Sequence, residues 1–283
     1  MKRTKGSMMN RREFLKNTGA AALALGVGGC LKTSLAGSGG SGRAAKPNII
    51  LCMTDDQGWG DTGYNGLKKI PTPSLDAMAA NGVRFDRFYV GHPSCTPCRA
   101  SVITGRNPNR LGCFWPGMPF RKQETTIAQA VKRAGYVSAH FGKWHLNGVA
   151  GPGKPIKADD PLGPLGVGFD EMFSVSNYFD TDWTFSRNGE HVKVQGDGSD
   201  AIVAEALKFA EKNAKTNKPF LALVWFGSPH SPNKPTPEDQ AKAGGSTYYG
   251  ELVGVDRAMG ALRDGLRKLG IADNTMLVFN SDN

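Results

Sequence analysis

The chain has 283 residues, of which 39% are hydrophobic and 9% aromatic, which is enough apolar side chain to bury one large core or two modest ones. The formal net charge is +10, but residues 1–30 carry six Lys or Arg against one acid, so half of this charge lies in the N-terminal segment. The remainder is mildly basic and has no cluster of Lys and Arg interleaved with aromatic residues, which argues against nucleic acid as a partner and suits a small anionic substrate.

This N-terminal segment has the features of an export signal. Arg11 and Arg12 form a twin-arginine motif, and the apolar run 20–27 that follows is too short to span a bilayer. Small residues directly before Cys30 resemble a lipoprotein cleavage box, so acylation of Cys30 is favoured over ordinary signal cleavage nearby. Residues 31–45 are rich in Gly and Ser and are predicted to be a flexible tether. The predicted partner is the twin-arginine export machinery, and the predicted location is the periplasm or cell surface, with the lipid anchor as the only membrane contact.

Residues 46–283 alternate between short apolar runs and helical patterns and are predicted to form one domain. In chain order, the pattern predicts a strand at 48–53, a helix from Thr72 that Gly82 stops, a strand at 83–90, a helix at 125–134, a strand at 136–141, a helix at 200–214, a strand at 220–226, a helix at 248–269 and a strand at 275–279. This alternation predicts an α/β fold in which helices cover both faces of a mostly parallel central sheet. The segment 148–198 is rich in Gly, Pro and Asp, shows weak periodicity, and is predicted to form loops on the substrate side.

Polar side chains follow four of the predicted strands. They are Asp55 and Asp56, Lys143 and His145, His230, and Asp282 and Asn283. Because open α/β sheets build their sites at the carboxyl ends of the strands, we expect these side chains to meet. Carboxylate and amide oxygens are ligands that suit calcium or magnesium, whereas zinc favours His or Cys. Taken alone, Asp55 and Asp56 fit a turn or helix cap equally well, and a lone His230 fits a structural role better.

A cysteine motif adds a second kind of chemistry. Residues 94–105 contain Cys95-Thr96-Pro97-Cys98-Arg99, followed by two residues, two apolar residues, Thr and Gly. This resembles the formylglycine-dependent sulfatases of the alkaline phosphatase superfamily, except that Cys98 replaces the usual Ser. The Cys-x-Pro-x-Arg core that the maturation enzyme reads is intact. Residues 135–145 resemble the family's second signature, and the aspartate pair and Ser-Pro-His match in order and spacing, so the resemblance covers essentially residues 46–283.

The resemblance implies a catalytic site. A formylglycine-generating maturation enzyme would oxidise Cys95 to an aldehyde, whose hydrate attacks the sulfur of a sulfate ester. Arg99 and Lys143 would hold the hydrate and neutralise the sulfate oxygens, His145 would be the base, and His230 would protonate the departing alcohol; Lys143 and His230 are the implied substrate contacts. The implied calcium ligands are Asp55, Asp56, Cys95, Asp282 and Asn283.

The other cysteines allow different interpretations. Cys95 and Cys98 form a Cys-x-x-Cys pair, which in isolation suggests a redox or metal site, but the surrounding motif argues against it. Cys52 lies in the first predicted strand and is expected in the core. Cys113 could pair with Cys98 in an oxidising compartment, which the sequence does not decide.

Two alternatives to a sulfate ester hydrolase stay open. One is a phosphonate monoester or phosphodiester hydrolase with the same nucleophile. The other is a catalytically inactive, lipid-anchored glycan-binding protein, against which the intact Cys95, Arg99, Lys143 and His145 argue. The expected substrates are sulfated glycans or aryl sulfates.

The end of the sequence also carries an expectation. Asp282 and Asn283 are the last two residues, whereas the resemblance implies a following Gly, a further Lys that contacts the sulfate, and a smaller C-terminal subdomain. Terminal residues have few contacts to hold them, and metal ligands need support from neighbouring structure. We therefore expect a catalytic domain truncated at its C-terminal end, with weakened calcium binding and little or no activity alone.

Overall fold

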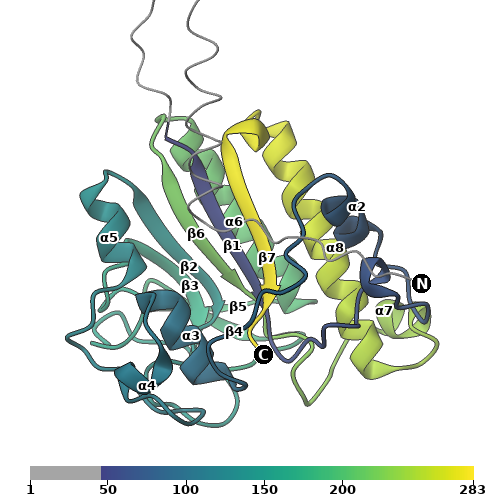
Figure 1. Cartoon of the computed structure of the whole chain (residues 1–283), viewed down its shortest axis with the longest axis horizontal. Helices are drawn as coiled ribbons and strands as arrows, with labels where there is room; N and C mark the ends of the chain where they lie inside the picture. The colour runs from purple at the N-terminus through teal and green to yellow at the C-terminus, as the bar shows by residue number, and fades with distance from the viewer. Residues whose placement is uncertain (1–45) are drawn as a thin grey trace, which may run out of the picture. The chain divides into compact units, whose positions relative to one another are not determined.

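A computed structural model describes residues 46–283, which form a seven-stranded sheet between helices (Figure 1). The export signal, Cys30 and the tether lie outside the described residues. The strand order is β5-β4-β3-β2-β6-β1-β7. The strands are β1 (Asn48–Thr54), β2 (Val137–Lys143), β3 (Glu171–Val175), β4 (Thr184–Arg187), β5 (Glu190–Lys193), β6 (Phe220–Trp225) and β7 (Thr275–Ser281). Five strands run parallel, and β4 and β5 extend one edge in antiparallel fashion.

Helices cover both faces of this sheet, which confirms the predicted fold class. They are α2 (Pro73–Ala80), α3 (Cys95–Thr104), α4 (Pro108–Leu111), α5 (Ile127–Arg133), α6 (Gly198–Ala214), α7 (Pro237–Lys242) and α8 (Thr247–Lys268), with 3-10 turns η1 (Gly63–Asn65) and η2 (Ala272–Asn274). Buried side chains of α2, α6 and α8 join the core on one face, and those of α3, α4 and α5 join the core on the other. None of the helices in the described range is long and apolar enough to cross a membrane.

The central strand β6 explains why both cores exist. Successive side chains of a strand point to opposite faces. Phe220, Ala222 and Val224 therefore enter the core under α6 and α8, while the alternate residues Leu221, Leu223 and Trp225 enter the other. A continuous apolar run is consequently the correct sequence for a strand that is covered on both faces.

Two sequence predictions were wrong, the strand at 83–90 and the loops at 148–198. Residues 83–90 alternate like a strand but form none, and Phe85 and Tyr89 are 74% and 82% exposed. A two-residue period specifies a strand only where a neighbouring backbone can pair with it, and within residues 46–283 this segment is paired with none.

The segment 148–198 is also more ordered than predicted, because it contains β3, β4 and β5. Arg187 pairs with Glu190 across a two-residue turn in which Asn188 and Gly189 both have positive φ. Asn-Gly between two short strands is the strongest local signal for a tight hairpin, so the sequence did hold this information.

Candidate active site

The carboxyl ends of four parallel strands meet at one edge of the sheet, as predicted. The backbone amide of Asp55, after β1, donates to Ser228 O at 3.1 Å, after β6. The amide of Asp282, after β7, donates to Thr54 O at 3.1 Å. After β2, His145 N donates to Ser176 O at 2.8 Å. These bonds fix the polar loops to one another, so the side chains they carry are held in register.

Helix α3, which the sequence analysis did not predict, places the cysteine motif above this edge. Cys95 is its first residue, and Gly105 ends it in the left-handed conformation. Pro97 is tolerated because amides in the first helical turn have no partner within the helix. Arg99 lies four residues after Cys95 and hence on the same face of the helix. The spacing of the motif therefore directs the Cys95 thiol and the Arg99 guanidinium toward the same strand ends.

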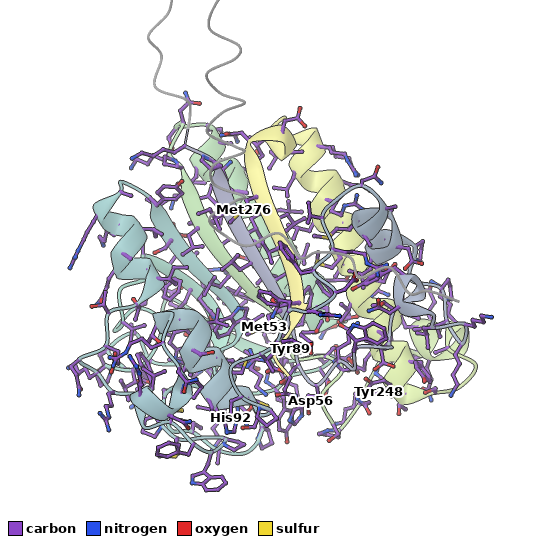
Figure 2. The ribbon with its side chains drawn as sticks, viewed as in Figure 1. Met53, Asp56, Tyr89, His92, Tyr248 and Met276 are labelled. Carbon is purple, nitrogen blue, oxygen red and sulfur yellow. The ribbon has the colours of Figure 1, made fainter. Side chains whose placement is uncertain are left out.

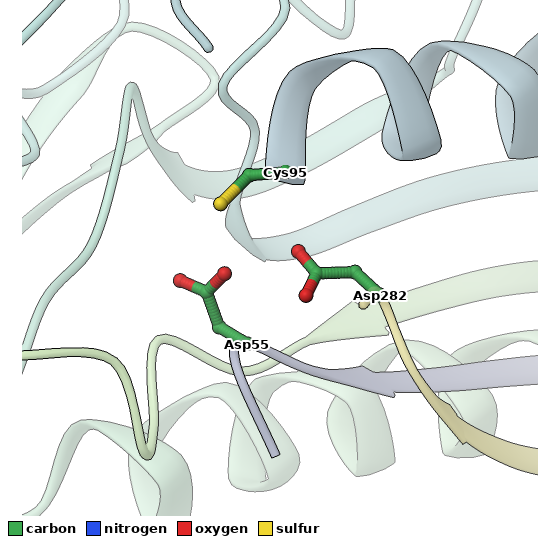
Figure 3. Close-up of side chains that lie close together, drawn as sticks. All are labelled: Asp55, Cys95 and Asp282. Carbon is green, nitrogen blue, oxygen red and sulfur yellow. The ribbon is translucent and has the colours of Figure 1, made fainter. Parts of the chain in front are cut away.

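Asp55, Arg99, Lys143 and Asp282 form a fully buried charged cluster, which we call the ionic floor. Arg99 Nη2 lies 2.7 Å from Asp282 Oδ2 and 3.2 Å from Asp55 Oδ1, and Lys143 Nζ lies 2.5 Å from Asp55 Oδ2. Figure 3 shows the two carboxylates side by side below Cys95. Two positive and two negative charges are thus paired away from water, which is necessary because an unpaired buried charge is strongly destabilising.

The two carboxylates of the floor differ in how readily they bind a proton. Burial alone would raise the pKa of Asp55, but Lys143 and Arg99 hold it well below its usual range. For Asp282, burial and the neighbouring Asp55 charge outweigh Arg99 and raise the pKa to about 7. A cation bound beside the pair would favour ionisation of both carboxylates.

A pocket of about 410 Å³ opens next to the floor. It is lined by Asp56, Pro93, Ser94, Cys95, Pro116, Gly117, His145, Ala150, Gly151, Asn177, His230 and Asn283. Five of the predicted site residues, Asp56, Cys95, His145, His230 and Asn283, thus form part of the pocket wall. The other four make up the floor and do not line the pocket. Substrate contact by Lys143 stays a prediction, since its ammonium is buried against Asp55.

Cys95 has the environment of a weakly acidic thiol. Burial and the charge of Asp55 raise its pKa to about 12, against the opposing effect of Lys143. The thiol is therefore protonated at neutral pH and is a poor nucleophile as it stands.

The neighbouring cysteines are also protonated thiols. Within residues 46–283, Cys52, Cys95, Cys98 and Cys113 are all free, so the possible disulfide between Cys98 and Cys113 is not formed. Burial raises the pKa of Cys98 and of Cys113 to about 11 in each case. Cys52 is fully buried in the core, as predicted.

The two histidines of the pocket wall differ in burial. Burial, followed by Lys143 and Arg99, lowers the pKa of His145 to about 3, so this imidazole is neutral at physiological pH. Its Nδ1 has no hydrogen-bond partner among the described residues. His230 is more exposed, stacks on Tyr178 with ring centroids 4.9 Å apart, and places Nε2 3.8 Å from Asp56 Oδ2. Its Nδ1 faces the backbone oxygen of Ser231.

The arrangement fits a hard cation. One ligand atom each from Asp55, Cys95 and Asp282 lie within 4.8 Å of one another, the only such group found among the described residues. Asp55 Oδ1 and Asn283 Oδ1 are buried without a hydrogen-bond partner in the same range. Asn283 Nδ2 donates to Asp56 Oδ1 at 2.7 Å, which brings the fourth and fifth predicted ligands to the same place. Oxygen-rich donor sets of this kind favour calcium or magnesium.

Some residues in the pocket wall or behind it were not predicted from the sequence. Thr96 Oγ1 donates to His145 O at 2.9 Å and accepts from Gly117 N at 2.8 Å, so it ties α3 to two parts of the pocket wall. Asn177 lines the pocket and donates to Gly151 O at 2.6 Å. Pro116-Gly117 is a turn signal that the sequence displays, but nothing in the sequence indicates that this turn reaches Cys95.

The fold and site together place a polar pocket beside a buried charged cluster at the strand ends of a parallel α/β sheet, and comparison with known proteins identifies the family. The profile of the sulfatase family matches residues 47–283. The chain is 31% identical to N-acetylgalactosamine-6-sulfatase of Canis lupus familiaris over 89% of its length, and 32% identical to the ulvan-active sulfatase of Formosa agariphila over 84%. This protein belongs to the sulfatase family. It spans about half the length of these relatives, namely 53% and 50%.

Solved structures also match this chain. The crystal structure of Ps i-CgsB in complex with k-i-k-neocarrahexaose matches with a TM-score of 0.76 and 30% identity, over 84% of this chain and 58% of that chain. A phosphonate monoester hydrolase of Agrobacterium radiobacter matches with a TM-score of 0.59 and 18% identity, over 84% of this chain and 62% of that chain, which supports the fold alone.

Proposed function

We propose that this protein hydrolyses sulfate monoesters of glycans, using a formylglycine derived from Cys95 and a bound calcium ion. The observation that carries the proposal is the position of Cys95. Its side chain lines the pocket, caps the buried Asp55 and Asp282 carboxylates, and belongs to the helix that brings in Arg99. Because the thiol itself is protonated and unreactive, this position suits a residue that is converted into a different nucleophile.

The cation and the modified residue have defined places in this arrangement. Calcium would be held by Asp55, Asp56, Asp282 and Asn283 and, once Cys95 is converted, by an oxygen of its formylglycine. When bound, calcium supplies positive charge toward the sulfate oxygens, and the formylglycine hydrate supplies the attacking hydroxyl.

The charged residues of the floor orient these groups. Arg99 is fixed by Asp282 and by Lys143 O, which accepts from Arg99 Nη1 at 3.2 Å. Lys143 is fixed by Asp55. Both cations are already held in place by carboxylates, so they need no reorganisation during the reaction, and calcium would add the positive charge that the internally compensated floor lacks.

The two histidines are suited to opposite proton transfers. His145 is neutral and so has a free nitrogen lone pair near residue 95, but the burial and cations that lower its pKa to about 3 make it a weak base until an anionic sulfate lies beside it. The Ser231 carbonyl can only accept, so His230 carries its first proton on Nδ1. A second proton on Nε2, beside Asp56, would then be the one that is given to the departing oxygen of the alcohol.

The substrate class rests on the named relatives. They include sulfatases named for N-acetylgalactosamine 6-sulfate and for ulvan, and a structure that holds a neocarrahexaose. A sulfated sugar is therefore proposed for the pocket.

The test is to produce the chain together with a formylglycine-generating enzyme and determine the mass of the peptide that contains residue 95. Calcium titration should then accompany assays with an aryl sulfate, a sulfated sugar and a phosphonate monoester. We expect an aldehyde at residue 95 and preference for sulfate, with Cys95→Ala folded but inactive.

Active protein with unmodified Cys95 would contradict the mechanism, and preference for the phosphonate ester would favour the alternative hydrolase. Binding of sulfated sugar without any turnover would favour the glycan-binding alternative.

Export and anchoring through Cys30 also belong to the proposal. Wild-type protein should partition with membranes after twin-arginine export, and Cys30→Ala should abolish processing at that residue. Fully soluble wild-type protein with an N-terminus beyond Leu31 would contradict the anchor.

A further inference from the structure

A tryptophan stands exposed beside the mouth of the pocket. Trp115 is 69% exposed, and the next two residues, Pro116 and Gly117, line the pocket. Met118 N donates to Trp115 O at 3.2 Å, and Gly117 has a φ of +80°. Proline followed by a residue of positive φ is typical of a type II turn, with Trp115 at its first position.

This turn is held rigidly against the catalytic helix. Gly117 N donates to Thr96 Oγ1 at 2.8 Å, and Thr96 is the residue after Cys95. On either side of the turn, Cys113 and Phe120 are buried in the core. The position of the Trp115 backbone is thereby coupled directly to that of the nucleophilic residue.

Exposure of an indole on a rigid turn needs an explanation. A large aromatic side chain loses the favourable free energy of burial when it remains in water, and nothing in the fold requires an aromatic residue at the first position of this turn. The adjoining pocket wall is polar, with Asp56, His230 and Asn283. An aromatic plane next to a polar pocket matches the amphipathic character of a sugar, which presents C–H groups on its face and hydroxyl groups at its edge.

The pocket has room for only one sugar of an oligosaccharide. A cavity of about 410 Å³ is near the lower end of ligand pockets and suits a single sulfated pyranose. Any sugar linked to it must therefore lie outside the pocket, and Trp115 is the exposed residue directly before the lining residues Pro116 and Gly117.

We propose that Trp115 forms a second subsite that stacks on the sugar next to the sulfated one, so that the substrate is a sulfated oligosaccharide or polysaccharide. This inference rests on the proposed function and adds the length of its substrate. An exposed aromatic face contributes to binding through contact area and stacking, for which a loss of about tenfold in affinity on removal is reasonable.

The test compares short and long probes on matched variants. Calorimetry in the Cys95→Ala background, with calcium present, prevents turnover. The probe pairs are galactose 4-sulfate with a neocarrahexaose, and N-acetylgalactosamine 6-sulfate with a chondroitin 6-sulfate hexasaccharide. In at least one pair the hexasaccharide should bind about tenfold more tightly than the monosaccharide. Trp115→Ala should remove this gain and leave the monosaccharide Kd within about twofold, while Trp115→Phe should retain part of the gain.

A control variant is available on β7 of the central sheet. Met276 is an exposed apolar residue of β7 that lies far from Asp56 and His92 (Figure 2), and Met276→Ala should change neither Kd. Thermal unfolding of each variant verifies that it is folded.

The outcomes separate this inference from the proposed function. If the monosaccharide sulfates bind and Trp115→Ala leaves hexasaccharide affinity unchanged, the second subsite is disproved while the proposed function stands. Equal weakening of both probes by Trp115→Ala also overturns it, because Trp115 would then contact the sulfated sugar itself. Failure of every sulfated probe to bind would overturn the proposed function and this inference together.

Discussion

The ionic floor and the pocket wall are adjacent but are built differently. In the floor, Asp55, Arg99, Lys143 and Asp282 have no exposed surface, and every charge faces an opposite one. In the wall, Asp56 and His230 keep 44% and 22% of their side chains exposed and interact only at 3.8 Å. The charges of the floor are thus compensated within the protein, with Asp55 Oδ1 left without a hydrogen-bond partner among the described residues, whereas the wall leaves polar atoms exposed to solvent.

This difference assigns separate tasks to the two regions. A buried ion pair gains little net stability, because desolvation offsets the attraction, but it fixes its members in position. The floor is therefore a rigid charged support, and recognition and proton transfer belong to the wall. Substitutions in the floor should impair both folding and calcium binding, while those at the wall histidines, His145 and His230, which are not proposed calcium ligands, should impair activity alone.

The largest expected effect comes from breaking the floor. Asp55→Asn removes the charge that compensates Lys143 and part of Arg99, and it should lower the free energy of unfolding by about 3–5 kcal/mol. Calcium affinity should fall by at least about 100-fold, since a ligand is lost. Urea unfolding in calcium-free buffer and calcium calorimetry measure the two effects.

The matched control is Asp86→Asn, which breaks an exposed ion pair with Arg84 and should change neither quantity appreciably. Wild-type stability in Asp55→Asn would show that the floor is not a paired cluster in solution.

A change in the wall should affect chemistry without affecting stability. In His230→Ala, turnover of a sulfated sugar should fall by about 100-fold, because its alcohol departs poorly without a proton. Turnover of 4-nitrophenyl sulfate should change much less, since nitrophenolate departs unaided. The ratio of kcat values for the two substrates is the measurement. Equal losses with both substrates would contradict the assignment of His230 as the acid.

Asp180 contrasts with the floor, because it is a buried carboxylate that has no ion pair among the described residues. Asp180 is 4% exposed, and neither of its oxygens has a hydrogen-bond partner among residues 46–283. Burial raises its pKa to about 7, despite Lys234. The folded state therefore binds a proton more tightly than the unfolded state, so this residue's contribution to stability is present below about pH 4 and is lost as pH rises to about 7.

We expect Asp180→Asn to be more stable than wild type at pH 8 by about 1–2 kcal/mol, with the difference disappearing toward pH 4.

Asp170 is the opposite case, because Lys132 and the amide of Ser138 lower its pKa despite partial burial. The stability that Asp170 contributes is present above its unfolded pKa and is lost on acidification, so Asp170→Asn should be destabilising at pH 8. Urea unfolding at several pH values measures the stability of each variant relative to wild type, and differences that change with pH in the same direction for both variants would refute at least one of the two predictions.

The smallest expected effect concerns the loop that carries Asp56. Tyr248 Oη donates to Asp61 Oδ2 at 2.6 Å and lies 3.4 Å from Asp56 O, and Figure 2 shows Tyr248 close to Asp56. Asp56 has a φ of +62°, a conformation that needs support from its surroundings. Tyr248→Phe should weaken calcium binding by about threefold, measured by calorimetry.

Tyr136→Phe is the control for this prediction, because it removes a hydroxyl that bonds only to Pro47 O at 2.8 Å. Identical calcium affinities for the two variants would mean that the loop is held without Tyr248.

Much of the fold was predictable because its signals are local. The apolar runs at β1, β2, β6 and β7 gave strands within about two residues of their observed ends, and the helices α2, α5, α6 and α8 followed from spacing and caps. Residues 83–90 misled the analysis, because a pattern cannot report whether a partner strand exists. Helix α3 was missed because its buried residues do not form an apolar stripe, as Arg99 lies among them.

The sequence by itself determined the family, the parallel sheet and the identity of the residues at the strand ends, since each depends on order and spacing along the chain. Tertiary structure alone decided which of them are paired in the floor and which face the pocket. Lys143 and His145 are two residues apart, yet one is neutralised by Asp55 and the other lines the cavity. Charge pairing and burial depend on distances between segments as remote as β1 and β7, and no local pattern encodes those distances.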